Sequence, residues 1–476
     1  MSDTFLGDSM PQGAKYSQSF NVDDHPFLAT GDGVADDTAA IMAAINAAAS
    51  SGGGEVVFTP GRNYLVNSAD VFLSHAFSSI WLSCKAPGTA TIINGSASQH
   101  ALTWGSVDTQ IYGGGIRGLA FSSQPDVLGL GVLIQNVGQF RIYDCRFQNY
   151  PSKLETGITL SGCSQFYFIG NEAQGCVTAG MLFIKCIDGY LAVNRSDSNE
   201  GAGIWYDGSQ GMYAVDCTAY INGQAWKLSS ADPSVQPNQN NFFVNCIGDT
   251  SNSYNFQIND SINTTFTASW GSTQISPAVN TWSSGFIITG KYSRHLVFNS
   301  PIAAYNNAHG IHIYDAGGDT APSYIFINNP ICGTEGISTS NGNGRTGAGF
   351  GISINGACDH IRISGGQFLN NASGAISNSS SGTDIIISGN PVGYVTSSQG
   401  QASISAGAST IVVPHGLGAA PGAGNITITD LSMRSASGIN STAITNVSST
   451  SFTLTTNVDI VGQDFRFAWQ ARVNGA

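Results

Sequence analysis

The sequence predicts an all-β solenoid in which each coil holds three short strands and three turns. Three observations indicate this fold: many glycines with few charges, a segment recurring about every 23 residues, and runs of alternating apolar and polar residues. Of the 476 residues, 41% are hydrophobic, 10% are charged and 59 are Gly. This apolar fraction is too high for a disordered chain, so the glycines indicate turns between strands.

The net charge of −13 disfavours nucleic acid, which is bound through basic patches, and also anionic membrane surfaces. No apolar run is long enough to cross a bilayer, and the first residues show no secretory signal. The nine cysteines have no metal-ligand spacing, so we expect buried thiols made in a reducing cytoplasm, with no metal and no cofactor.

The first ordered element predicted is a short helix within residues 31–66. An Asp-Asp-Thr sequence at 36–38 supplies candidate N-caps, and glycines at 52–54 end the helix. A strand at 55–59, a Pro60-Gly61 turn and Tyr64 follow. The apolar residues predicted to share one helix face are Ile41, Ala44, Ile45 and Ala48.

This order of Gly-Asp-Gly, cap, helix, glycine run, strand and Pro-Gly turn resembles the N-terminal signature of the pectate-lyase-like β-helix superfamily. The resemblance implies a right-handed parallel β-helix whose open end is covered by the helix. The superfamily includes hydrolases, lyases, epimerases and phage tailspikes, so the motif does not select a function. Asp32, Asp36 and Asp37 are better explained as turn and cap residues than as catalytic acids.

The internal repeat is clearest in the middle of the chain. At four positions a glycine begins a segment of alternating apolar residues. The last two intervals between these glycines are 23 residues, and so is the interval from the last glycine to Trp226. These glycines are Gly131, Gly157, Gly180 and Gly203. The first and third residues after each glycine should face inward, and the second and fourth outward.

Small polar residues are predicted to stack in columns at the turns. One column contains Cys145, Asn171, Asn194, Cys217 and Cys246, and a second contains Cys163 and Cys186. Looser coils are predicted to start near Tyr254, Gly285, Gly310, Gly351 and Ala375, with a Gly/Asn/Ser-rich loop at about 333–349.

The predicted organisation has three parts: an attachment segment at 1–24, the β-helix at 25–397 and a small β-sandwich-like domain at 398–476 for trimerisation or carbohydrate binding. In the last strand one face should be buried, so Trp469 is predicted to pack in the core rather than hold a sugar. The residues on that face are Phe465, Phe467, Trp469, Ala471 and Val473.

Glycosidic bonds are commonly cleaved by two carboxyl groups. We predict Glu200 and Asp207 as the acid/base pair, with Asp197 as a third carboxylate. Trp205, which should face outward, and Tyr220 are predicted to hold sugar rings. Asp216, expected to point outward from the next strand, is also predicted to bind substrate. Solvated turn residues are the alternative interpretation of each of these carboxylates.

A second candidate region contains His312 and Asp315, predicted to bind substrate, together with His309, Asp319, Glu335 and Arg345. A lone His in a strand is more often packed or solvated than catalytic. A third candidate site lies between subunits and contains Asp144, Arg146, Lys153 and Glu155.

The superfamily resemblance, the lack of a signal and the small terminal β domain favour a tailspike-type depolymerase that cleaves a bacterial capsule, O-antigen or exopolysaccharide. Hydrolysis is expected, because Lys and Arg total only 17 and a uronate lyase needs groups that neutralise the sugar carboxylate. A lyase is the runner-up. A non-catalytic receptor-binding fibre and a pectinase-like, fructan-processing or epimerase relative are further alternatives.

Tailspikes of this type are trimers, so the resemblance implies a homotrimer. The other expected partners are bacterial polysaccharide and other phage tail proteins. The expected location is the virion tail, or outside the cell after lysis.

Overall fold

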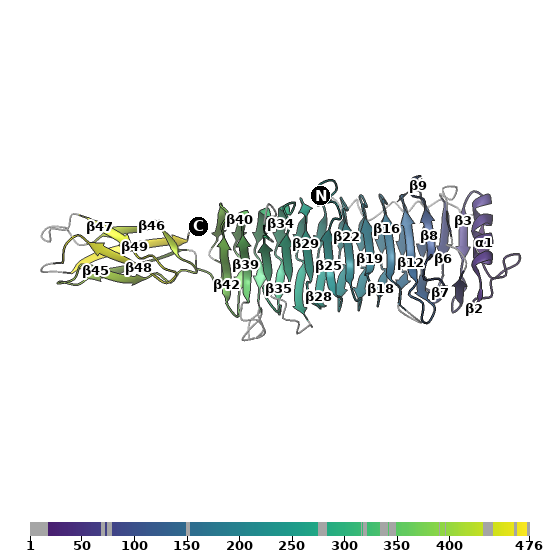
Figure 1. Ribbon diagram of the computed structural model, residues 1–476, viewed down its shortest axis with the longest axis horizontal. Coiled ribbons are helices and arrows are strands. Elements are labelled where there is room, and N and C mark those ends of the chain that lie inside the picture. The colour runs from purple at the N-terminus through teal and green to yellow at the C-terminus, as the bar shows by residue number, and fades with distance from the viewer. Residues whose placement is uncertain are drawn as a thin grey trace. The chain divides into compact units, whose positions relative to one another are not determined.

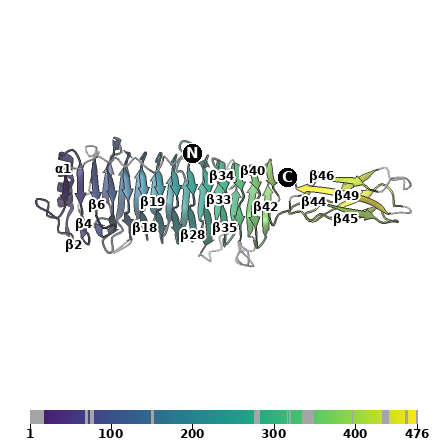
Figure 2. The same cartoon turned by 180° about the vertical axis from the view of Figure 1, so that it is seen from behind.

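A computed structural model of the chain describes residues 18–67, 72–73, 79–148, 153–274, 283–315, 317, 321–333, 341, 349–389, 391–395, 397–431, 441–460 and 464–473. The described strands form three large parallel sheets, named here A, B and C, of 16, 13 and 12 strands. Successive strands along the chain enter these sheets in turn (Figures 1 and 2). This arrangement confirms the predicted all-β, right-handed parallel β-helix.

The chain divides into two compact units, 1–223 and 224–476. In the first unit, sheet A contains β1 (Ser19–Asn21), β3 (Gly54–Val57), β6 (Ile80–Ser83), β10 (Gly115–Arg117), β14 (Arg141–Tyr143), β17 (Tyr167–Ile169), β20 (Tyr190–Ala192) and β23 (Tyr213–Val215). Sheet B contains β2 (Asp32–Asp36), β4 (Asn63–Val66), β7 (Ala90–Asn94), β11 (Leu119–Ser123), β15 (Arg146–Phe147), β18 (Glu172–Gln174), β21 (Arg195–Asp197) and β24 (Thr218–Tyr220). Sheet C contains β5 (Phe72–Leu73), β8 (His100–Gly105), β12 (Leu130–Gln135), β16 (Thr156–Ser161), β19 (Ala179–Ile184) and β22 (Ala202–Asp207), while β9 (Ile111–Tyr112) pairs with β13 (Val137–Gly138).

In the second unit, sheet A contains β26 (Asn238–Gln239), β27 (Phe242–Val244), β30 (Ser261–Ile262), β31 (Thr265–Thr267), β34 (Arg294–Asn299), β37 (Ser323–Asn328), β40 (Asp359–Ser364) and β43 (Ile385–Ser388). Sheet B contains β28 (Ile247–Ser251), β32 (Trp270–Gln274), β35 (Ile302–Ala304), β38 (Ile331–Cys332) and β41 (Gln367–Phe368). Sheet C contains β25 (Gln224–Ser229), β29 (Phe256–Asn259), β33 (Phe286–Thr289), β36 (Ile311–Tyr314), β39 (Phe350–Gly356) and β42 (Gly374–Ser380).

The predicted helix is α1 (Thr38–Ser50), which packs against β1, β3 and β6 and covers the first coil (Figure 1). Its buried face is the predicted one. The carboxylate of Asp36 accepts hydrogen bonds from the Thr38 amide (3.0 Å) and hydroxyl (2.5 Å). Asp37 instead accepts the amides of Thr30 and Gly31 and is buried, and burial raises its pKa. Asp36 and Asp37 therefore stabilise the entry turn, as predicted.

The coil register agrees with the sequence repeat. Ile158, Met181 and Ile204 pair in adjacent strands of sheet C and are fully buried, whereas Trp205 and Asp207 lie on the outer, half-buried side. Parallel strands lie about 4.8 Å apart, so like residues in one column stack face to face. In the second unit, for example, the rings of Phe266 and Phe298 stack at 4.8 Å.

The turn columns also form as predicted. The Cys145 amide donates to Asn171 Oδ1 (3.0 Å), and the Asn171 amide donates to Asn194 Oδ1 (2.9 Å). All nine cysteines are buried and free. Burial raises the pKa of the thiols of Cys145 and Cys176 to about 12, as expected for thiols packed in the core.

Residues 397–473 pair differently, in two antiparallel sheets of three strands. One sheet contains β44 (Ser397–Ile404), β46 (Pro421–Asp430) and β49 (Phe465–Val473), and the other contains β45 (Thr410–Pro414), β47 (Thr442–Thr445) and β48 (Ser451–Thr456). Trp469 belongs to the apolar cluster of this module, as predicted, and contacts Phe452 edge to face.

The predicted boundary at 397/398 falls where parallel pairing gives way to antiparallel pairing, although the two compact units divide at 223/224. The three-part division of the chain remains a prediction. Residues 1–17, most of the predicted attachment segment, lie outside the described residues, as does most of the loop at 333–349.

Candidate functional site

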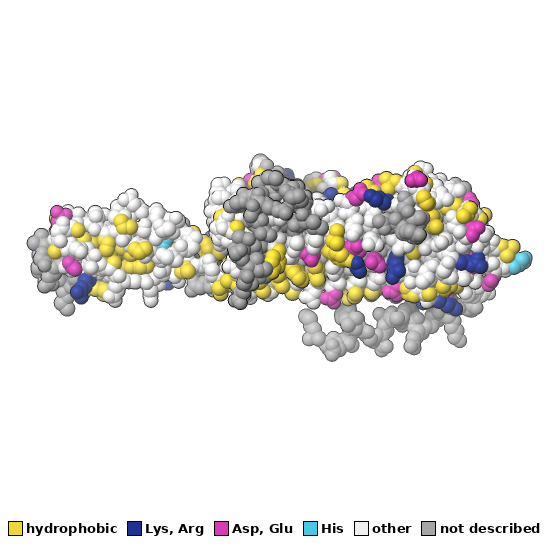
Figure 3. Space-filling view, turned by 90° about the horizontal axis from the view of Figure 1, so that it is seen from below, with side chains coloured by type: hydrophobic (Ala, Val, Ile, Leu, Met, Phe, Trp, Pro, Cys, Tyr) yellow, Lys and Arg dark blue, Asp and Glu magenta, His cyan; other side chains and the backbone are white. Residues whose placement is uncertain are grey.

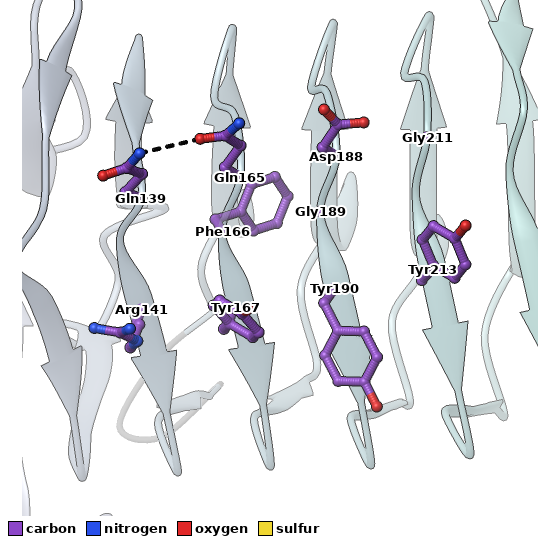
Figure 4. A pocket seen from close by; sticks show the side chains of 10 residues that line it. All are labelled: Gln139, Arg141, Gln165, Phe166, Tyr167, Asp188, Gly189, Tyr190, Gly211 and Tyr213. Carbon is purple, nitrogen blue, oxygen red and sulfur yellow. Dashed lines mark hydrogen bonds between the residues drawn. The ribbon is translucent and has the colours of Figure 1, made fainter. Parts of the chain in front are cut away.

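A groove of about 590 Å³ crosses the outer face of sheet A in the first unit (Figure 4). It spans four successive strands, β14, β17, β20 and β23. The residues that line it are Gln139, Arg141, Gln165, Phe166, Tyr167, Asp188, Gly189, Tyr190, Gly211 and Tyr213. Two parallel rows of side chains, one aromatic and one polar, therefore run along the groove.

The aromatic row consists of three tyrosines and begins at Arg141, because these four residues occupy the first position of successive short strands. Arg141 pairs with Tyr167, Tyr167 with Tyr190, and Tyr190 with Tyr213. The residue after each of them is buried in the core, so these four side chains lie on the outside. Tyr167 is 41% exposed and Tyr213 is 48% exposed, so solvent reaches part of both side chains.

The polar row lies in the turn before each strand. Gln139, Gln165, Asp188 and Gly211 all adopt a left-handed conformation, with φ of 53°, 52°, 55° and 63°. Because one backbone conformation repeats coil after coil, the side chains of Gln139, Gln165 and Asp188 lie in one row (Figure 4). The Gln139 amide nitrogen donates to Gln165 Oε1 at 3.2 Å (Figure 4).

The groove has one charged group of each sign among its lining residues. The Arg141 guanidinium lies 5.7 Å from the centre of the Tyr167 ring, and the rings of Tyr167 and Tyr190 are 6.0 Å apart. Aromatic faces offer apolar contact, while the amides and the Asp188 carboxylate offer hydrogen bonds. Such a combination suits a polar ligand with flat apolar faces, such as a chain of sugar rings.

The structure separates the predicted acid/base pair. Glu200 lies in the turn before β22, where it forms an ion pair with Lys153, and Asp207 lies at the far end of that strand. An extended strand rises about 3.3 Å per residue, so Ala202 and Asp207 are about 16 Å apart. Glycosidase carboxyl groups act within about 10 Å of each other. The structure therefore does not bring Glu200 and Asp207 together.

Asp197 belongs to a ladder of charges on sheet B. Its carboxylate accepts hydrogen bonds from Arg195 Nε (3.2 Å), Gln174 (3.1 Å) and Ser198 (3.1 Å), and it is 3% exposed. Glu172 lies between Arg146 and Arg195, at 3.5 Å and 3.7 Å. On the face shown in Figure 3, most side chains are neutral, and acidic and basic groups lie next to one another. These contacts already occupy the Asp197 carboxylate.

The remaining predicted residues of this region lie on different surfaces. Trp205 is on the outer face of sheet C beside Leu182, as expected from the register. Tyr220 is on sheet B, with the Arg195 guanidinium 4.9 Å from its ring centre, so one ring face is covered. Asp216 was expected on a strand but lies in the turn after β23, with φ of 50°, and is exposed.

The histidine region is packed rather than open. His309 and His312 are 7% and 2% exposed, and their rings contact each other at 4.8 Å. Burial lowers the pKa of His309 to about 4 and that of His312 to about 3. Asp315 accepts the amides of Gly317 (2.9 Å) and Ala357 (3.2 Å). Asp319, Glu335 and Arg345 lie outside the described residues.

The third predicted group is divided between two ion pairs. Arg146 contacts Glu172, and Lys153 contacts Glu200. Asp144 lies in the turn after β14 with φ of 54°, and Glu155 is half-buried before β16. A role for these residues between subunits remains a prediction.

Sequence reasoning missed the whole groove. Its signal was present, because Tyr167, Tyr190 and Tyr213 are spaced by 23 residues, the coil period. Within the described ranges no group of three His, Cys, Asp or Glu residues could hold a metal ion. Nor does that part of the chain contain a helix with the length and apolar character needed to span a bilayer.

Comparison with known proteins supports the fold. The family described as rhamnogalacturonase A/epimerase, pectate lyase-like, matches residues 19–76, the segment that contains α1. No curated protein sequence matches the chain significantly.

Among solved structures, tailspike protein 3 of bacteriophage CBA120 has a TM-score of 0.59 and 16% identity, covering 81% of this chain and 60% of that chain. The A-module of mannuronan C-5 epimerase AlgE4 from Azotobacter vinelandii has a TM-score of 0.50 and 16% identity, covering 78% and 97%. Pre-mature gene product 12 of bacteriophage phi29 has a TM-score of 0.51 and 15% identity, covering 73% and 52%. At these identities the likeness concerns the fold alone. In fold, the chain is thus a right-handed parallel β-helix, like these tailspike and epimerase structures.

Proposed function

We propose that the protein is a tailspike-type depolymerase that binds a bacterial surface polysaccharide along the groove on sheet A and cleaves it. The observation that carries this proposal is the row of Tyr167, Tyr190 and Tyr213 beside the polar row that contains Asp188. A polymer with a repeating backbone fits a site that repeats at the coil spacing. The fold likeness to a phage tailspike supports the same function.

Hydrolysis by carboxylates is the proposed reaction. Within the groove lining, Asp188 is the one carboxylate, and it lies beside the aromatic row that would hold the sugar rings. We propose Asp188 as the first acidic group to test, with Asp197, Glu200 and Asp207 as the carboxylates proposed from sequence. Asp188 is the first to test because it lines the groove, whereas Asp197 and Glu200 form ion pairs with Arg195 and Lys153.

A lyase acting on a uronate-containing glycan is the second candidate function. The groove has three tyrosines but a single carboxylate among its lining residues. Elimination requires a base for the proton next to the uronate carboxyl group, and a tyrosine hydroxyl can fill that role. A paired-carboxylate mechanism requires a second acid, which the groove lining does not supply.

The experiment is to incubate the protein with a panel of bacterial capsular, O-antigen and exopolysaccharides. New reducing ends and the ultraviolet absorbance of unsaturated uronates are followed together. The same assay is run on Tyr190→Ala, Asp188→Asn, Glu200→Gln and Asp207→Asn. Glu172→Gln, which alters the charge ladder on sheet B, is a control outside the groove.

Reducing ends without new absorbance, lost in Tyr190→Ala and Asp188→Asn, would support hydrolysis in the groove. Reducing ends with absorbance would identify the lyase. Binding without cleavage would indicate a receptor-binding fibre. Full activity of both groove variants would reject the groove as the site, and loss in Glu200→Gln or Asp207→Asn would then favour the carboxylates proposed from sequence.

We further propose that the protein acts as a homotrimer on a phage tail, alongside other tail proteins. The fold likeness to two bacteriophage proteins supports this setting. Light scattering coupled to size exclusion tests the trimer, because it should give three times the mass of one chain. A monomeric mass at assay concentrations would contradict it.

A further inference from the structure

Arg141 differs from the other arginines of the first unit in its contacts. Within the described part of that unit, each of the other four lies within 4 Å of a carboxylate, whereas no ion pair is found for Arg141. These pairs are Arg62 with Asp23, Arg117 with Glu55, Arg146 with Glu172, and Arg195 with Glu172 and Asp197. A guanidinium is always charged and binds carboxylates through two parallel hydrogen bonds. Arg141 is therefore the arginine that remains able to take an external anion.

The surroundings of Arg141 are aromatic on both sides. Its guanidinium lies over Tyr167 at 5.7 Å. Burial raises the pKa of Tyr143, and the adjacent Arg141 opposes that rise. The charge of Arg141 therefore lies near both Tyr143, at the end of its own strand, and Tyr167 on the next one.

The aromatic surface continues beyond the groove through a glycine. Gly115 occupies the position between Trp81 and Arg141 in the outer column of sheet A. A Cβ added at Gly115 would lie 2.7 Å from Trp81 Cζ3, so the indole covers the glycine. The Trp81 ring also stacks on Tyr143, with centres 6.3 Å apart and planes at 28°. Aromatic rings therefore flank Arg141 along the strand-stacking direction on both sides.

We infer that the groove is built for an acidic polysaccharide, with the anionic group of one sugar on Arg141 and the neighbouring rings on Trp81–Tyr143 and on Tyr167–Tyr213. This inference rests on the proposed function and adds the substrate class. Asp188 is two coils from Tyr143's strand, about 10 Å at the usual strand spacing. The negative charge of Asp188 disfavours an anionic sugar beside it. Arg141 therefore determines which sugar of the repeat occupies each position of the groove.

The test measures binding of hyaluronan, alginate, polygalacturonate and a panel of acidic and neutral bacterial capsular polysaccharides. Each acidic polymer that binds is measured again after its carboxylates have been reduced to primary alcohols. The proteins compared are the wild type, Arg141→Gln, Tyr190→Ala and Trp81→Ala. Arg62→Gln, an arginine paired with Asp23 outside every candidate site, is the matched control, and circular dichroism checks folding.

Arg141→Gln is expected to lose about tenfold in affinity for the acidic polymer and little for its reduced form, because one charge-assisted contact is removed. Tyr190→Ala and Trp81→Ala should weaken binding of both forms, and Arg62→Gln should weaken binding of neither. Added salt should weaken wild-type binding more than that of Arg141→Gln.

If Tyr190→Ala weakens binding while Arg141→Gln affects the acidic and reduced polymers equally, the acidic specificity is overturned and the groove stands. Preference for a neutral polymer would also overturn the acidic specificity. If Tyr190→Ala and Arg141→Gln both bind like the wild type, or no polymer binds, the groove itself is rejected.

Discussion

The carboxylate of Asp188 lies against Gly211 of the next coil: a Cβ added at Gly211 would come within 2.5 Å of Asp188 Oδ1. Gly211 also has φ of 63°, which a side chain disfavours. Because Gly211 has no side chain, the Asp188 carboxylate can occupy the space beside it in the polar row.

Gly211→Ala is expected to displace the Asp188 carboxylate and to weaken glycan binding or cleavage. The backbone conformation should also cost about 1 kcal/mol of stability. Gly52→Ala is the matched control, because Gly52 has φ of 83° and no atom within 4 Å of an added Cβ. Denaturant unfolding and the glycan assay check both variants. Both variants should lose a similar amount of stability, but only Gly211→Ala should lose glycan binding or cleavage. Equal function in the two variants would contradict the role of Gly211.

Asn199→Ala is expected to destabilise the first unit by about 1–3 kcal/mol, since it leaves a buried amide without an acceptor. Asn199 Oδ1 accepts the Cys176 amide at 2.8 Å, and its Nδ2 donates to Asn222 Oδ1 at 2.8 Å. The midpoint of guanidinium unfolding measures the change. Asn46→Ala, on the exposed side of α1, should leave the midpoint unchanged or raise it. Similar midpoints for the two variants would show that the amide column contributes little.

The thiols are expected to be unreactive in the folded protein at pH 8. Burial raises the pKa of Cys145, Cys176 and Cys358 to about 12, and the thiolate is the reactive form. A chromogenic disulfide reagent should titrate few thiols before denaturation and all nine afterwards. Rapid reaction of several thiols in the native state would contradict the buried columns.

Acid is expected to destabilise the second unit through its histidine pair. The folded-state pKa is about 4 for His309 and about 3 for His312, below the ordinary 6.5. As the pH falls below about 6.5 the unfolded chain takes up protons that the folded chain does not. The free energy of unfolding should therefore fall as the pH drops from about 6.5 to about 4 because of His309, and should fall further to about pH 3 because of His312. The total loss should be a few kcal/mol, on the order of the shifts in pKa.

Denaturant midpoints at pH 7, 5.5 and 4.5 measure this dependence. His312→Gln should flatten this pH dependence, and His295→Gln, at an exposed histidine of the same unit, is the control. Identical pH dependence in the wild type and His312→Gln would exclude the buried ring as a cause.

The fold could be predicted from sequence because its determinants are local and periodic. The spacing of Gly157, Gly180 and Gly203 fixed which residues of each segment face inward, and the structure confirms that register. The site could not be predicted in the same way. Glu200 and Asp207 are close in sequence, but an extended strand carries them apart. The tyrosines of the groove are far apart in sequence and meet only because coils stack, on strands too short to give an alternating pattern.

Coil stacking also means that the number of coils sets the length of the groove. Each coil adds one tyrosine-bearing strand and about 4.8 Å of length along the row. Insertion or deletion of one whole coil would lengthen or shorten the groove by that step without breaking the ladders above and below it. Gain or loss of whole coils would therefore change the length of polymer repeat that fits the groove, while the side chains that each coil presents stay the same.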